Sequence, residues 1–144
     1  MLAPQAQPVG PAAGRLAIAI LRVELAAIAG TFLLFALLHA GVHVAGVAEP
    51  RIVPAVIVET TCGLCLALAA VVGLARPAWT WGTAVTANAV SAAGVLLGIV
   101  AQSRGVGPAP LDFVYHRTVL AVLLASLALL VAVRATLSRS ARDD

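Results

Sequence analysis

The strongest constraint on this fold is a series of four apolar stretches, each more than 20 residues long. They cover residues 25–46, 52–75, 82–102 and 113–137. A helix of about 20 residues spans the roughly 30 Å hydrocarbon core of a bilayer. Only 10% of all residues are charged, against about 25% in soluble domains, so a soluble fold could not cover this surface. The sequence therefore predicts an all-α integral membrane protein with one domain.

Short links join the first three stretches, and short links favour antiparallel neighbours. We therefore expect an up-down four-helix transmembrane bundle over residues 15–137. Residues 1–14 contain three prolines and lack a periodic pattern, which predicts a disordered N-terminal tail. Residues 15–24 either lie at the membrane interface or extend the first helix. Residues 138–144 are expected to form a short C-terminal tail.

Arginine placement predicts the orientation. Four crossings put both termini on one side, and positively charged residues favour the cytoplasmic side. The side with the termini would hold Arg15, Arg22, Arg76, Arg134, Arg139 and Arg142, and the other side would hold Arg51, Arg104 and Arg117. We predict N-in and C-in, in a bacterial plasma membrane, because the Ala-rich, lysine-free composition is typical of a high-GC genome. Arginines scattered in this way do not indicate nucleic-acid binding.

Polar residues from three of the stretches are expected to gather at the outer side. His39 and His43, in the segment HAGVH, are four residues apart, which places them on one face of a helix. Glu59 lies about seven residues into the second stretch, so its depth of about 10 Å matches that of His39. Asp112 is the expected N-cap of the fourth helix. The predicted polar pocket, open to the outer side, comprises His39, His43, Glu59, Cys62, Asp112, His116 and Arg117.

Four interpretations of this pocket are open. In the first, its polar groups satisfy one another, with Glu59 paired to His39 or Arg117. The protein would then be a non-enzymatic binding or accessory subunit without a cofactor. In the second, the three histidines and Glu59 hold copper, zinc or haem b, for which imidazole is a suitable ligand. In the third, Glu59 carries protons in a small transporter that acts as a dimer.

The fourth interpretation is thiol chemistry at residues 62–65, which read CGLC. Thiolates are disfavoured near the middle of a bilayer, so we interpret both cysteines as small apolar residues. The sequence also lacks a glycine-rich phosphate loop and a Ser-His-Asp signature. We therefore expect no enzymatic activity. The expected partners are the lipid bilayer and either a second copy of the chain or a larger membrane complex.

Small residues recur at steps of three and four along the third stretch. Such a seam permits close backbone approach between helices in lipid. It either packs within the bundle or forms a dimer contact, and Asn88, which lies off the seam, is expected to bond to a neighbouring helix. The seam comprises Ala84, Ala87, Ser91, Gly94, Gly98 and Ala101.

Overall fold

This computed structural model describes residues 11–106 and 110–143. Within them, the regular secondary structure is helical. Its elements are α1 (Pro11–His39), α2 (Val53–Ala75), the short 3-10 helix η1 (Pro77–Trp79), α3 (Thr80–Ser103) and α4 (Pro110–Asp143). The four α-helices are each long and apolar enough to cross a membrane. Of the predicted N-terminal tail, residues 1–10 lie outside the described residues and residues 11–14 belong to α1.

The first helix ends earlier than predicted, at His39 rather than at residue 46. Gly41 has a φ of 93°, a left-handed conformation that suits glycine. Its N–H donates to Leu38 O, and the N–H of Val42 donates to Leu37 O. This pair of hydrogen bonds is the Schellman motif, which caps the last carbonyls of a helix and turns the chain away.

The other helix boundaries follow from prolines and short loops. Pro54 occupies the first turn of α2, where a missing N–H has no cost, and α2 ends before Pro77. The N–H of Ile52 donates to His39 O at 3.0 Å, which holds the start of α2 against the end of α1. Residues 138–143, predicted as a tail, continue α4. Asp112 is the third residue of α4 rather than its N-cap.

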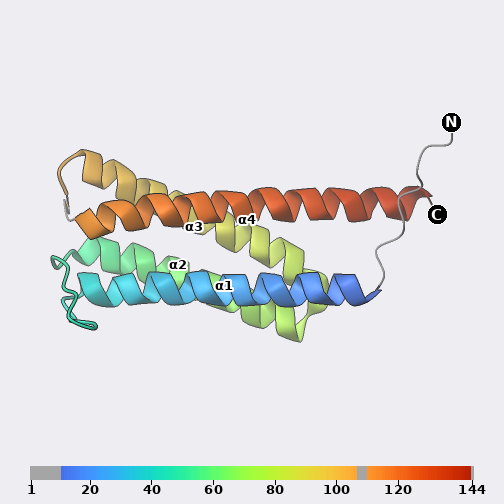
Figure 1. The fold of residues 1–144 in the computed structure, drawn as a ribbon, viewed down its shortest axis with the longest axis horizontal. Helices are drawn as coiled ribbons and strands as arrows, with labels where there is room; N and C mark the ends of the chain where they lie inside the picture. The colour runs from blue at the N-terminus through green and yellow to red at the C-terminus, as the bar shows by residue number, and fades with distance from the viewer. Residues whose placement is uncertain (1–10, 107–109, 144) are drawn as a thin grey trace.

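Consecutive helices run in opposite directions and pack against one another, α1 on α2, α2 on α3 and α3 on α4 (Figure 1). The end of α1 and the starts of α2 and α4 lie together, and we call this part of the molecule the loop end. There α1 also meets α4 through aromatic rings. Phe35 stacks on Tyr115 with centroids 3.5 Å apart, and Phe32 meets the same ring edge-on.

Most of the apolar surface faces outward. In the most apolar segment of each helix, only 22–39% of the residues are buried inside the protein. A soluble protein of this composition would need to bury far more. Large side chains such as Leu64, Leu68 and Leu97 are exposed. A surface of this kind is stable in contact with lipid acyl chains and would aggregate in water.

The small-residue seam of α3 lies against two neighbouring helices. Ala84, Ala87, Ser91 and Gly94 are buried. A Cβ on Gly94 would come within 2.6 Å of the Cys62 sulfur, and one on Gly98 would overlap the His116 ring. Asn88 differs from the prediction, because its Nδ2 donates to Ala84 O of its own helix at 2.9 Å.

Candidate functional site

His39 and Glu59 form a buried pair between α1 and α2. His39 is the last residue of α1, and its Nδ1 lies 2.8 Å from Glu59 Oε2. Their relative exposures are 0% and 2%. With Glu59 ionised, Nδ1 carries the proton and donates it, which leaves the lone pair on Nε2. The two side chains meet because helical rise places them at the same depth, as the sequence indicated.

Asp112 and His116 come from the first turns of α4, with Gln102 of α3 beside them. His116 Nδ1 lies 2.9 Å from both Asp112 Oδ1 and Asp112 O. The ring directs its N–H at the carbonyl oxygen, and a carbonyl can only accept, so Nδ1 carries the proton. Gln102 Nε2 donates to Asp112 Oδ2 at 2.7 Å. Both Asp112 and His116 are buried.

Together these side chains bring all four helices to one place at the loop end. We call them the polar cluster. It comprises His39, Glu59, Gln102, Asp112 and His116.

Several buried atoms of the polar cluster lack a hydrogen-bond partner. In the tautomers described above, these atoms are all acceptors: His39 Nε2, Glu59 Oε1, Gln102 Oε1 and Asp112 Oδ1. His39 Nε2 faces Asp112 Oδ1 at 3.6 Å, beyond the usual hydrogen-bond range of about 2.7–3.2 Å. Two buried lone pairs that face each other repel, so the geometry calls for either a proton or a metal cation between them.

Three residues of the polar cluster have ligand atoms close enough to share one metal ion. One atom each of His39, Glu59 and Asp112 lies within 4.8 Å of the other two. All three residues are buried, so water competes little for their lone pairs.

A pocket of about 250 Å³ opens beside the polar cluster, between α2, α3 and α4. Glu59, Gln102, Asp112 and His116 line one part of it. Its remaining wall is apolar and includes Phe32, Val58, Val95, Leu97, Ala101 and Val106. The pocket therefore combines acceptor groups with a hydrocarbon surface.

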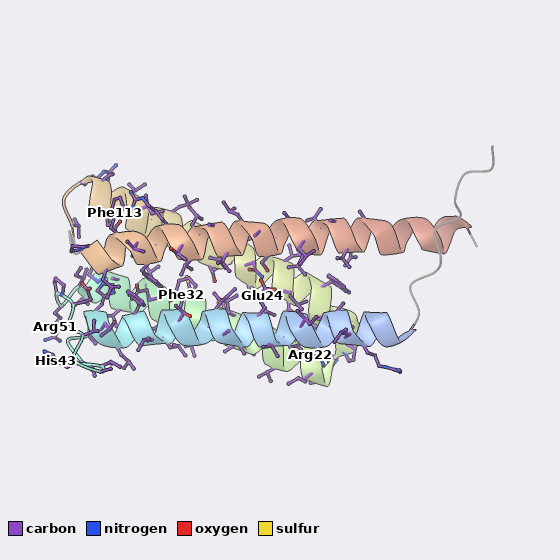
Figure 2. All side chains as sticks on the ribbon, in the orientation of Figure 1. Arg22, Glu24, Phe32, His43, Arg51 and Phe113 are labelled. Carbon is purple, nitrogen blue, oxygen red and sulfur yellow. The ribbon has the colours of Figure 1, made fainter. Side chains whose placement is uncertain are left out.

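Three residues of the predicted pocket lie elsewhere. His43 is exposed in the loop that follows α1, so it does not share a helical face with His39 (Figure 2). Arg117 is exposed, with its guanidinium over the Phe113 ring and a hydrogen bond to Phe113 O. Cys62 is buried against Gly94, and both cysteine thiols are free.

Sequence reasoning missed Gln102 and the role of Gly98. Gln102 closes the third apolar stretch near the end of α3, and the packing of α3 on α4 brings it to Asp112 in the first turn of α4. A polar residue at each end of a loop between antiparallel helices was the available signal. Gly98 leaves room for the His116 ring, and only the packing of α3 against α4 reveals that role.

Glu49 of the loop provides a test of electrostatics near the polar cluster. Partial burial, and next the charge of Asp112, raise the pKa of Glu49, while His39 opposes this shift. A carboxyl with a raised folded-state pKa stabilises the fold when protonated and loses that contribution as pH rises through the folded pKa. Glu49→Gln should therefore stabilise the protein more at pH 7 than at pH 4, measured by unfolding in micelles. An equal effect at both pH values would contradict this placement.

The polar cluster is suited to binding a cation rather than an anion. It holds two carboxylates, and the atoms without partners offer lone pairs. The pocket gives the polar cluster a way to meet a small ligand.

Comparisons with protein families, curated proteins and solved structures found no match for this chain.

Proposed function

We propose that this chain is an up-down four-helix transmembrane bundle of a bacterial plasma membrane that binds a divalent transition-metal ion without catalysing a reaction. Four apolar helices that alternate in direction support the bundle (Figure 1). The arginine distribution supports cytoplasmic termini, which places the polar cluster toward the outer side. The metal ligands are His39 and Asp112, and Glu59 orients His39.

The separation between His39 Nε2 and Asp112 Oδ1 carries this proposal. At 3.6 Å, these atoms are too far apart for a good hydrogen bond. Two ligands of a tetrahedral zinc ion, each about 2.0–2.1 Å from the metal, lie roughly 3.3 Å apart. A small shift would therefore let both atoms bind one ion. Glu59 would orient His39 by accepting the Nδ1–H at Oε2, an arrangement common around metal-bound histidines.

The donor set favours zinc over haem and over magnesium. Imidazole nitrogen binds zinc and copper well, whereas magnesium and calcium prefer oxygen ligands alone. A haem ligand needs open space in front of its free nitrogen. His39 Nε2 instead faces Asp112, and the His116 ring lies against Gly98. Neither histidine has room for a porphyrin.

Metal titration of the purified protein tests the proposal. After chelation and dialysis, the protein in detergent should bind Zn²⁺ stoichiometrically, measured by calorimetry and elemental analysis. Asp112→Asn and His39→Ala each remove a ligand and should weaken binding by at least about 100-fold. His43→Ala is the matched control, because it removes an exposed histidine of the same HAGVH segment and should leave the affinity unchanged. A folded protein that takes up neither zinc nor copper would refute the metal site.

A further inference from the structure

The pocket beside the polar cluster has two unlike parts. The wall from α2 and α3 is hydrocarbon, with Val58, Val95 and Leu97 among its side chains. The part from α2 and α4 carries the carboxyl groups of Glu59 and Asp112. A metal ion would occupy only the carboxylate part, and nothing about a metal requires the apolar wall.

The hydrogen-bonding balance of the pocket selects the chemistry of a ligand. Among its described lining residues, Glu59 Oε1 and Gln102 Oε1 are buried acceptors without donors, and Asp112 Oδ1 has only its 2.9 Å ion-pair contact with His116 Nδ1. Leaving such an atom unpaired costs about 1–3 kcal/mol, and more for a charged group. A matching ligand must therefore supply N–H or O–H donors, and two carboxylates favour a donor with positive charge. An anion, or a ligand with acceptors only, would leave these buried acceptors unpaired and bring further acceptors close to them.

The size of the pocket limits the body of the ligand. A volume of about 250 Å³ equals about eight water molecules at roughly 30 Å³ each. This space suits a single aromatic ring or a short alkyl chain. Since most of its wall is apolar, the body of the ligand must be apolar as well.

We propose that the pocket binds a small lipophilic amine in its protonated form, with the ammonium at Glu59 and Asp112 and the apolar body against the α2–α3 wall. This proposal rests on the cation-binding function described above and adds a second class of cation at the same carboxylates. The amine and a metal ion compete, because both need Asp112 Oδ1. Gln102 Oε1 accepts a further N–H of the ammonium.

Ligand-observed NMR tests this proposal with 4-fluorobenzylamine as the probe. The full chain is reconstituted in lipid nanodiscs, because detergent would compete for an apolar pocket, and empty nanodiscs give the partitioning background. The amine should bind saturably, and Zn²⁺ should displace it. The neutral alcohol of the same shape and the N,N,N-trimethyl derivative, which lacks N–H donors, should each bind at least about 10-fold more weakly.

Two sets of variants locate the binding. Asp112→Asn and Glu59→Gln remove charge with little change of shape and should each weaken amine binding at least about 10-fold. Ala101→Phe fills the apolar part and should abolish amine binding while zinc affinity stays unchanged. Ala93→Phe, on the exposed face of the same helix, is the matched control and should have no effect.

The outcomes separate this inference from the metal site. Equal binding of the amine and the alcohol would overturn it, as would saturable binding that survives Ala101→Phe. Absence of saturable amine binding in a protein that binds zinc would overturn it and leave the metal site standing. Saturable amine binding in a protein that takes up no metal would support it and refute the metal site. Circular dichroism of each variant shows whether the helices are retained.

Discussion

Glu59→Ala is expected to lower the free energy of unfolding by about 3–5 kcal/mol, because it leaves a buried imidazole without its partner. His39 is 0% exposed and its Nδ1 has Glu59 Oε2 as a hydrogen-bond partner at 2.8 Å. In the apolar interior no water replaces the lost acceptor. Glu59→Gln should cost less, since the amide oxygen still accepts from Nδ1.

A double-mutant cycle measures this pair directly. Glu59→Ala, His39→Ala and the double variant are unfolded reversibly in mixed micelles. The double variant should be much less destabilised than the sum of the two single variants, because removing both partners leaves no unpaired group. Thr61→Ala is the control on the same helix, since its exposed hydroxyl bonds only to Ile57 O, and it should change stability by less than about 0.5 kcal/mol. Additive single effects would contradict the pairing.

Gly98→Ala is expected to destabilise the protein by about 1–3 kcal/mol, although alanine is the better helix former. An added Cβ would overlap Nε2 and Cδ2 of His116. The ring would have to move, and the imidazole is held at Asp112 by two contacts of 2.9 Å. The change therefore separates α3 from α4 at the loop end or breaks the contact of His116 with Asp112.

Gly82→Ala is the matched control for this prediction. It lies on the same helix, and nothing approaches its added Cβ within 4 Å, so alanine should be neutral or stabilise by about 0.5–1 kcal/mol. His116→Ala combined with Gly98→Ala removes the overlap and should recover much of the loss caused by Gly98→Ala alone. The same reversible unfolding assay measures all three variants. A neutral Gly98→Ala would contradict the close packing of α3 on α4.

The end of α1 shows where sequence patterns failed. Hydropathy stays high from residue 25 to residue 46, so it predicts one continuous helix that carries His39 and His43 on one face. Gly41 instead adopts a positive φ and caps the helix. Hydropathy cannot detect this, because it counts glycine as a mildly apolar residue and ignores its access to the left-handed region.

The sequence by itself determined that the helices are apolar enough to cross a membrane, how many such helices there are, and that His39 and Glu59 lie at matching levels of their helices. Composition and length fix the first two, and a constant helical rise fixes the third. Only the tertiary structure decided how each helix is rotated about its axis, because residues that are apolar on every face leave rotation undetermined. The rotation of the helices brings Gln102 to Asp112, places Gly98 where it leaves room for His116, and sets His39 Nε2 opposite Asp112 Oδ1. The polar cluster therefore depends on packing, which no periodic pattern in the chain encodes.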